Sequence, residues 1–303
     1  MKILTLPLVL TAALGVLAPP ASAAGQGATP KQTAGQEQAG QASAWVRLTS
    51  AADIVGRTLR DPQGNEAGQI AGLVLDRDSG VVLYAVVSSA GSFDVGPDYV
   101  AVPFPAFKVD RGIASVTVGI AAEKIAKAPR ITAARLAELG QSESVGSVYG
   151  DYAIPTPQGY VVPPSDDRAR HPDRFVLVRP GQVLPPQAAQ ELARDVRGAD
   201  VRIAGGGVVG EIERVMIDTG TMRVAYLLVT HGGFLGFDEK WLPVPLQALT
   251  WSPAERAYIL KGSTSQLKQM QGLPKGETPT RVRREQLQAL YQRFGLRPYW
   301  QLG

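Results

Sequence analysis

The sequence predicts a mainly β protein in which two small closed β-barrels, each with short flanking helices, are followed by a C-terminal amphipathic helix. Three observations predict this fold class: an internal repeat with an offset of 142 residues, short β-branched runs separated by turn residues, and a proline-rich stretch between the two copies. A repeat of this length indicates a duplicated structural unit.

The N-terminus has the layout of a secretory signal peptide. Met1-Lys2 precedes an apolar run to Leu17, and Ala21-Ser22-Ala23 predicts cleavage after Ala23, which gives a signal peptide over 1–23. The run is shorter than the roughly 20 residues that span a bilayer, so a permanent anchor is the weaker interpretation. Residues 24–43 contain no bulky apolar side chain and are expected to form a flexible leader. We therefore expect a periplasmic protein.

Composition excludes several classes of site. The chain has no cysteine, so disulfides, thiolate metal sites and cysteine nucleophiles are excluded. The formal net charge is +4, but residues 275–303 alone carry six basic and two acidic side chains, which leaves the rest of the mature chain close to neutral. A body without a broad basic field argues against nucleic acid as the main partner.

The internal repeat places residues 56–107 over residues 198–249 without a gap. Thirteen of the 52 aligned positions are identical, and several of them are glycines in expected turns. The identical pairs are Gly56/Gly198, Arg60/Arg202, Gly64/Gly206, Gly68/Gly210, Ile70/Ile212, Asp76/Asp218, Val82/Val224, Tyr84/Tyr226, Val87/Val229, Gly91/Gly233, Val102/Val244, Pro103/Pro245 and Ala106/Ala248.

Within each copy the local pattern is β. In the first copy, residues 70–75 and 81–87 are apolar, β-branched runs joined by the turn Asp76-Arg77-Asp78-Ser79-Gly80. Five or six such strands with tight turns favour a closed barrel, which also hides its edges. We place the first barrel at 44–140 and the second at 173–274, with short helices expected at 133–139 and 185–193.

A linker is expected between the barrels, and a helix after them. Residues 141–172 hold five prolines, three glycines and three tyrosines, so we expect an irregular segment that lies partly against a domain surface. Residues 275–303 are expected to form a basic amphipathic helix that Thr280 caps and Gly295 ends. Its apolar face would consist of Leu287, Leu290, Tyr291 and Phe294.

The second copy carries the residues of a known family. Gly210-Glu211-Ile212-Glu213-Arg214-Val215-Met216-Ile217-Asp218, the run 224–229, Gly232-Gly233-Phe234-Leu235-Gly236 and Lys240-Trp241-Leu242-Pro243-Val244-Pro245 resemble the PRC-barrel domain. The first copy matches in the strands but departs at residues 88–93. The resemblance implies a small β-barrel that acts as a docking or assembly surface for macromolecules, with no catalytic residues shared across the family.

Three motifs that suggest chemistry are better explained as turns. His171 and His231 do not lie in a nucleophile-elbow context. The turn beginning at Asp76 lacks the bidentate Glu of a calcium loop. Gly205-Gly206-Gly207 leads into a strand and lacks the Lys-Ser or Lys-Thr of a phosphate loop. We therefore assign no catalytic, metal-binding or cofactor-binding residue and expect no cofactor.

Two sets of residues are candidate contact sites. Phe234, Leu235, Phe237 and Trp241 form a candidate protein interface, although Trp241 and one phenylalanine could instead fill the barrel. Arg281, Arg283, Arg284 and Arg293 form a candidate contact with an anionic lipid or an acidic partner, although they could simply be the solvated face of a docked helix.

These expectations describe a non-enzymatic periplasmic scaffold whose tandem barrels dock envelope proteins or associate with each other. The alternative is an envelope sensor that binds lipid or a small molecule through the barrel ends and the basic helix. An enzyme is the third choice, because no pair of titratable groups is placed for acid-base catalysis.

Overall fold

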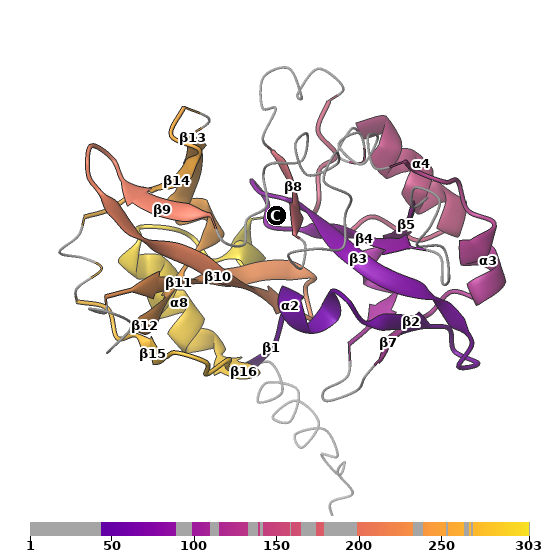
Figure 1. The fold of residues 1–303 in the computed structure, drawn as a ribbon, viewed down its shortest axis with the longest axis horizontal. Helices are drawn as coiled ribbons and strands as arrows, with labels where there is room; N and C mark the ends of the chain where they lie inside the picture. The colour runs from indigo at the N-terminus through magenta and orange to yellow at the C-terminus, as the bar shows by residue number, and fades with distance from the viewer. Residues whose placement is uncertain are drawn as a thin grey trace, which may run out of the picture. The chain divides into compact units, whose positions relative to one another are not determined.

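The computed structural model describes residues 44–88, 99–109, 115–132, 139, 142–157, 159–164, 174–178, 199–232, 239–252, 254–263, 267 and 269–302. In Figure 1 these residues form strands in two sheets, with helices beside them, and the protein is mainly β, as the sequence predicts. No helix in this described part is long and apolar enough to cross a bilayer. The predicted signal peptide and leader, the helix at 185–193 and most of the helix at 133–139 lie outside it.

The sheet of repeat 1 has the strand order β5-β4-β3-β2-β7-β6, and only β2 and β7 run parallel. Its central strands are buried on both faces: Ala85 and Val87 of β4 belong to one apolar cluster, while Tyr84 and Val86 belong to another. Both faces are therefore packed, which explains continuous apolar runs in place of alternation. The strands are β2 (Thr58–Arg60), β3 (Glu66–Asp76), β4 (Val82–Ser88), β5 (Tyr99–Pro103), β6 (Phe107–Lys108) and β7 (Ser115–Val118).

The sheet of repeat 2 follows the same path, in the order β13-β14-β9-β10-β11-β12-β15. The parallel pair recurs between β14 and β9, and the long strands β3 and β10 have register shifts at equivalent positions. The sequence repeat is therefore a repeat of structure. The strands are β9 (Asp200–Ile203), β10 (Val208–Asp218), β11 (Arg223–His231), β12 (Lys240–Val244), β13 (Leu249–Ser252), β14 (Ala257–Leu260) and β15 (Leu273–Pro274).

The two sheets are not closed barrels, so the closed-barrel prediction is only partly correct. In each repeat another segment pairs with the strand at one end of the sheet: Tyr99 of β5 bridges to Ile131, and Trp241 of β12 pairs with Leu273. Ile131 and Leu273 are equivalent at the offset of 142 residues. A strand edge can pair with only one neighbour. The segment that contains Ile131 or Leu273 therefore occupies the edge of β5 or β12 that would have to pair with another strand to close a barrel.

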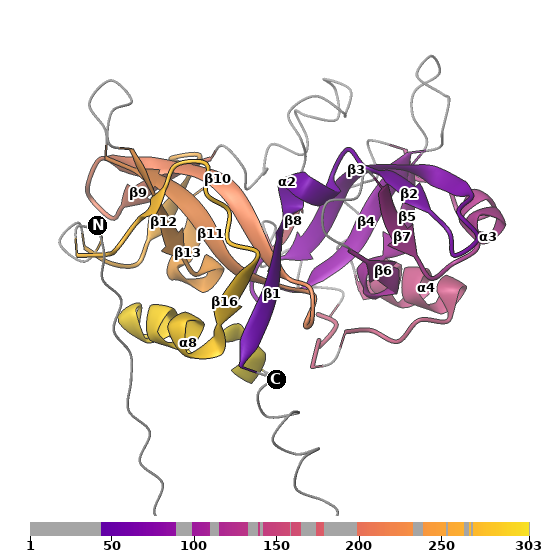
Figure 2. The ribbon, with the colours of Figure 1, turned by 90° about the horizontal axis from the view of Figure 1, so that it is seen from below.

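Each repeat receives a strand from the chain that precedes the other repeat. β1 (Trp45–Ser50) leads into repeat 1 but pairs with β10 of repeat 2, beside which it lies in Figure 2. β8 (Phe175–Val178) precedes repeat 2 in the chain but pairs with β3 of repeat 1. The two repeats have therefore exchanged strands reciprocally.

The two exchanged strands make the same hydrogen bond in each repeat. The N–H of Thr219 donates to the carbonyl of Arg47 at 3.1 Å, and the N–H of Arg77 donates to the carbonyl of Arg174 at 2.8 Å. Thr219 and Arg77 are equivalent positions of the repeat. The exchange is thus symmetric in its detailed contacts.

The repeats also contact each other directly at two hairpin turns. The N–H of Val82 donates to the carbonyl of Met222 at 2.9 Å, and the N–H of Val224 donates to the carbonyl of Gly80 at 2.8 Å. Val82 and Val224 are equivalent, as are Gly80 and Met222. The contact is therefore self-complementary, like a twofold interface between subunits.

A helix follows each sheet at the same position of the repeat: α4 (Ser142–Tyr152) in repeat 1 and α8 (Arg284–Arg293) in repeat 2. The hydroxyl of Tyr149 in α4 donates to the carbonyl of Leu83 at 2.8 Å. The hydroxyl of Tyr291 in α8 donates to the carbonyl of Ala225 at 2.9 Å. The duplication therefore extends through both helices.

The segment 141–172, expected to be an irregular linker, thus begins with a helix of repeat 1. Its serines and glycines have low helix propensity, and the burial of Val145 and Tyr149 stabilises the helix instead. The tyrosines of this segment lie against the sheet, as expected: Tyr149, Tyr152 and Tyr160 are all buried.

The C-terminal segment differs from the prediction at its start. Residues expected in the first turn of the helix form β16 (Arg281–Arg283), which pairs with β1, so α8 begins at Arg284. Gly295 follows the helix with φ 68°, as expected of a helix stop. The remaining short elements are α2 (Ala51–Ile54), η1 (Phe104–Ala106), α3 (Ala122–Ala126), η3 (Leu246–Ala248) and η4 (Tyr299–Gln301).

Strand exchange predicts that damage to one exchanged strand weakens the other repeat. Leu48→Ala should remove about 2–5 kcal/mol of packing and increase amide hydrogen exchange in β10 and β11 more than in β3 and β4. Phe175→Ala should have the opposite preference, because Phe175 pairs with Asp76 as Leu48 pairs with the equivalent Asp218. Native-state hydrogen exchange measures both, and faster exchange confined to β3 and β4 in Leu48→Ala would contradict the pairing.

The ends of the two helices allow a second, internally matched test. Ala153 follows α4 with φ 55°, whereas its equivalent after α8 is Gly295 with φ 68°. A side chain in the left-handed region costs about 1–2 kcal/mol. Ala153→Gly should therefore raise the free energy of unfolding by roughly 0.5–1 kcal/mol, and Gly295→Ala should lower it by about 1 kcal/mol. Chemical denaturation measures both free energies of unfolding. Changes of the same sign in the two variants would refute this explanation.

Candidate functional site

An exposed face of basic and aromatic side chains lies on the pair β1 and β16. In this antiparallel pair Trp45 lies opposite Arg283, and Arg47 lies opposite Arg281. These four residues are exposed, while Val46 between them is buried. The alternation follows from the period of two residues in a strand. We call Trp45, Arg47, Arg281 and Arg283 the Trp45 face.

The indole of Trp45 lies under two guanidinium groups. The guanidinium carbon of Arg283 is 4.9 Å from the ring centre, and that of Arg281 is 5.6 Å away. Trp45 is still 42% exposed. Cation–π contacts at such exposed sites contribute about 0.5–1 kcal/mol each. The contacts therefore orient the ring and the two cations while leaving them accessible.

Within the described residues, the positive charges of this face have no acidic partner. Among the described residues, no carboxylate forms an ion pair with Arg47, Arg281 or Arg283. Arg47 and Arg281 lie directly opposite each other, and like charges in such pairs are destabilising. An arginine side chain binds a carboxylate or phosphate through two parallel hydrogen bonds. The face is therefore suited to a ligand with several anionic groups.

The face also has a strand edge. Among the described strands, β16 pairs only with β1. On its other edge the N–H of Arg283 donates to Oε1 of Gln286 at 3.1 Å, so a peptide could use only the main chain of Arg281 and the carbonyl of Arg283. An extended peptide can add to such an edge through main-chain hydrogen bonds. The edge is short and basic, which disfavours pairing with another copy of itself.

The four arginines of the predicted anionic contact do not lie together in the structure. Arg281 and Arg283 belong to the Trp45 face, but the guanidinium of Arg284 lies over the ring of Trp300, 5.1 Å from its centre. Arg293 lies nine residues further along α8, about 13 Å away along the axis, and donates to the carbonyl of Gln269 at 3.3 Å. Sequence reasoning missed Trp45 and Arg47, although the alternation of residues 45–48 could have indicated an exposed strand face.

Of the four residues of the predicted interface in repeat 2, the structure describes only Trp241. Trp241 is only 3% exposed and packs in the core, with the guanidinium of Arg214 5.8 Å from its ring centre. It fills the sheet interior, which was the alternative interpretation, because the period of two points its side chain inward. Phe234, Leu235 and Phe237 lie outside the described residues.

The turn aspartates serve the fold. In repeat 1 the carboxylate of Asp76 accepts the N–H of Asp78 at 2.9 Å and pairs with Arg174, whose Nη2 lies 2.9 Å from Oδ2. In repeat 2 the carboxylate of Asp218 accepts the hydroxyl of Tyr299 at 2.8 Å. Burial, followed by the nearby Asp218 charge, raises the pKa of Tyr299, so this phenol stays protonated and donates. Both carboxylates are therefore engaged in hairpin turns, as the sequence predicts.

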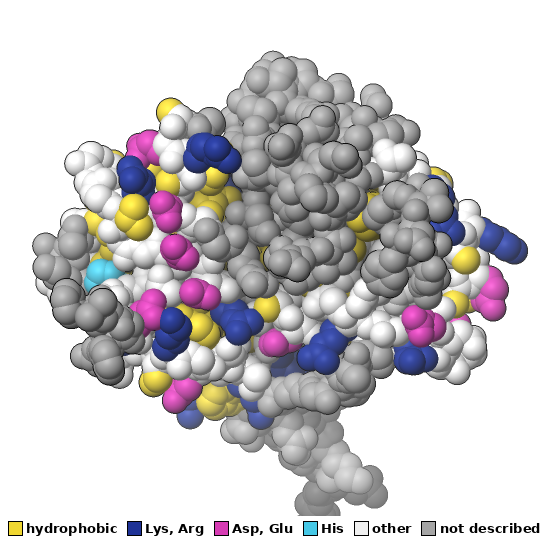
Figure 3. All heavy atoms as spheres, viewed as in Figure 1, with side chains coloured by type: hydrophobic (Ala, Val, Ile, Leu, Met, Phe, Trp, Pro, Cys, Tyr) yellow, Lys and Arg dark blue, Asp and Glu magenta, His cyan; other side chains and the backbone are white. Residues whose placement is uncertain are grey.

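The described residues do not bring together a set of three or more His, Cys, Asp or Glu side chains that could hold a metal ion. His231 lies at the end of β11, with its Nδ1 3.1 Å from the carbonyl of Val209. His171 lies outside the described residues. On the face shown in Figure 3, basic and acidic side chains are interspersed rather than gathered into one field.

We expect that reversing the charge of Arg47 slightly raises the free energy of unfolding. Arg47→Glu should replace a like-charge pair with an opposite-charge pair across β1 and β16 and raise the free energy of unfolding by about 0.5–1 kcal/mol. Arg297→Glu makes the same charge change at an exposed position outside the face and should give no such gain. Denaturation at low salt measures both, and a gain that survives roughly 1 M salt would contradict the electrostatic origin.

Comparison with protein families identifies the two repeats. The family model of the PRC-barrel domain matches residues 48–120 and 189–267, which together make up half of the chain. The two matched regions cover most of the two sheets described above. No curated protein matches the chain.

Proposed function

The chain belongs to the PRC-barrel family, and on that premise we propose that it is a non-enzymatic periplasmic scaffold that docks an acidic, extended segment of an envelope protein on the Trp45 face. The pairing of β1 with β10 and with β16 attaches this face to the sheet of repeat 2, and the predicted signal peptide is the reason for proposing a periplasmic location. The proposal includes no cofactor.

The observation that carries the proposal is the accessible indole of Trp45 between two arginines, beside Arg47, which has no ion-pair partner among the described residues. Tryptophan and arginine are the residue types most enriched in binding hot spots. Acidic side chains of a partner would neutralise the like charges of Arg47 and Arg281, so binding would remove a repulsion present in the free protein.

An acidic protein segment fits the face better than an anionic membrane does. A peptide can use the charges, the indole and the main-chain groups of Arg281 on the outer edge of β16 together, whereas lipid headgroups offer no strand to that edge. The division of the arginines also argues against a membrane-binding helix, because Arg284 and Arg293 do not extend the Trp45 face along α8.

A non-enzymatic role is supported by the use of the polar groups. The turn aspartates hold hairpins, and the buried tyrosine hydroxyls of Tyr149 and Tyr291 bind main-chain carbonyls. None of these groups pairs an acid with a base in an open cleft, which acid-base catalysis requires.

Photo-crosslinking in living cells tests the proposal. The exported, tagged protein carries p-benzoylphenylalanine in place of Thr280, an exposed residue next to Arg281, either alone, with Arg47→Glu, or with Arg297→Glu. We expect one protein adduct whose crosslinked peptide is rich in Asp and Glu. The adduct should fall at least tenfold in Arg47→Glu and persist in Arg297→Glu. Because Arg47→Glu is expected to be the more stable protein, loss of the adduct would not reflect unfolding.

Two outcomes would overturn the proposal. An adduct that is unchanged in Arg47→Glu would show that the charges of the face do not select the partner. Absence of a protein adduct, together with binding to phosphatidylglycerol vesicles that Arg47→Glu abolishes, would instead support the lipid-associated sensor.

A further inference from the structure

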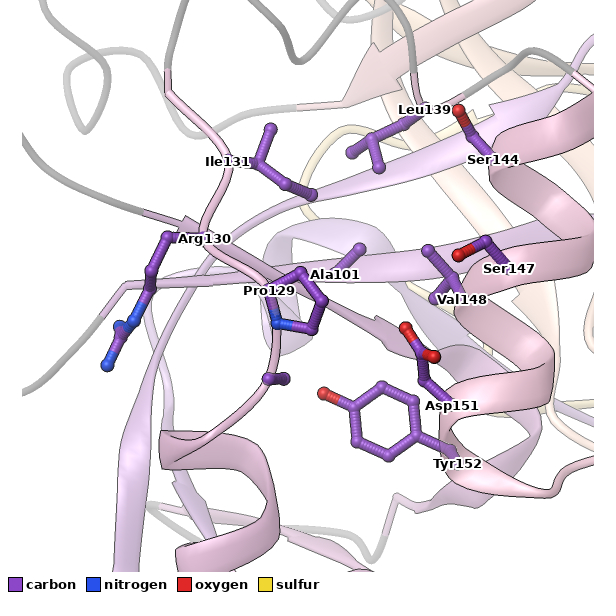
Figure 4. A pocket seen from close by; sticks show the side chains of 11 residues that line it. Ala101, Pro129, Arg130, Ile131, Leu139, Ser144, Ser147, Val148, Asp151 and Tyr152 are labelled. Carbon is purple, nitrogen blue, oxygen red and sulfur yellow. The ribbon is translucent and has the colours of Figure 1, made fainter.

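A pocket of about 300 Å³ lies in repeat 1, between α4, β5 and the segment 128–131 (Figure 4). It is remote in sequence from the Trp45 face and takes no part in the docking proposed above. The two walls of the pocket differ in chemistry. Their composition indicates what kind of molecule could bind there.

One wall is a single face of α4, on which the apolar Val148 lies among four oxygen-bearing side chains. Ser144, Ser147, Asp151 and Tyr152 recur at the spacings of three, four and eight residues that place side chains on one side of a helix. In Figure 4 they extend from the same side of the helix toward the opposite wall. Each offers an oxygen that can accept a hydrogen bond.

The opposite wall is apolar. It consists of Ala101 of β5 with Pro129, Ile131 and Leu139, which face α4 in Figure 4. Such a wall excludes water from one side of a bound molecule and favours a hydrocarbon body. The pocket is therefore amphipathic, with acceptors on one side and hydrocarbon on the other.

The charged side chains among the described lining residues are Asp151, which is exposed, and Arg130. Among the described residues the carboxylate of Asp151 has no ion-pair partner. Arg130 also lines the pocket, but its Nη2 donates to the carbonyl of Ala126 at 3.1 Å, and in Figure 4 the side chain extends away from the cavity. Asp151 lies in the last turn of α4, where the helix dipole is also negative. Both effects favour a cation.

The hydroxyl of Tyr152 is an unused hydrogen-bonding group in the same wall. Tyr152 is only 6% exposed, and its hydroxyl has no hydrogen-bond partner. Burial, followed by the charge of Asp151, raises the pKa of Tyr152 to about 12, so the phenol stays neutral at physiological pH. The ammonium group of Lys124 lies 5.7 Å from the ring centre of Tyr152, so it contacts the ring and not the hydroxyl. A buried polar group without a partner is costly unless a ligand or water satisfies it.

In repeat 2, the positions equivalent to Asp151 and Tyr152 carry different side chains. The equivalent of Asp151 is Arg293, whose guanidinium donates to the carbonyl of Gln269. The equivalent of Tyr152 is Phe294, which lacks the hydroxyl. The acceptors of the pocket wall are therefore specific to repeat 1, while the scaffold around them is shared.

We propose that the pocket of repeat 1 binds a primary ammonium ion on a short apolar body. The three N–H donors of the ammonium would meet the carboxylate of Asp151 and the oxygens of Ser147 and Tyr152. The apolar body would lie against Ile131 and Pro129.

Three probes that share one hydrocarbon chain test this proposal on the mature full-length protein: n-hexylamine, hexan-1-ol and hexanoate. Isothermal titration, with the aromatic resonances of Tyr152 followed by NMR, should show saturable binding of n-hexylamine. Hexan-1-ol should bind at least tenfold more weakly, and hexanoate should not bind. Asp151→Asn should weaken n-hexylamine at least tenfold.

Two further variants separate binding from folding. Tyr152→Phe copies the residue that repeat 2 already uses, so it should fold, but it should bind n-hexylamine several-fold more weakly. Glu285→Gln removes an exposed carboxylate from α8, outside the pocket, and should leave the affinity unchanged. Equal affinities for n-hexylamine and hexan-1-ol, unchanged affinity in Asp151→Asn, or no saturable binding would each overturn the proposal.

Discussion

The reciprocal exchange of β1 and β8 is the constraint on which the rest of the structure depends. Each sheet is incomplete without a strand that belongs, by chain order, to the other repeat. The exchange brings the two repeats into contact, so that their hairpin turns bond to each other at equivalent positions. It also places the N-terminal strand beside the C-terminal strand β16, and that neighbourhood creates the Trp45 face.

The two repeats share the packing contacts of their sheets and helices, but they differ in several polar side chains. The helix tyrosines Tyr149 and Tyr291 make the same bond to equivalent carbonyls, because this contact docks each helix on its sheet. The turn aspartates differ in partner, with Arg174 for Asp76 and Tyr299 for Asp218. Residues that face the interior are thus under packing constraints in both copies, whereas exposed positions on α4 and α8 are free to diverge in charge.

Elements that rest on local patterns were predictable. The hairpins around Asp76 and Asp218, the strands that flank them and the helix stop at Gly295 follow from turn residues and apolar runs. The identity of Gly68 and Gly210 also has a local cause: an added Cβ would lie 2.3 Å from the carbonyl oxygen of Ser88 and 1.6 Å from that of Thr230. Helix α4 was missed because its residues favour a helix only when Val145 and Tyr149 are buried against the sheet.

By itself, the sequence determined that the protein contains two β repeats of one family, where most of their strands lie, and that its charge is concentrated at the C-terminus. Only the tertiary structure decided that the sheets stay open, that the repeats exchange strands, and that Arg281 and Arg283 flank Trp45. The reason is physical. Strand periodicity and turn chemistry involve only a few neighbouring residues, so they can be recognised in a short stretch of sequence. The partner of a strand edge is selected by packing across more than a hundred residues, and no local pattern records that choice.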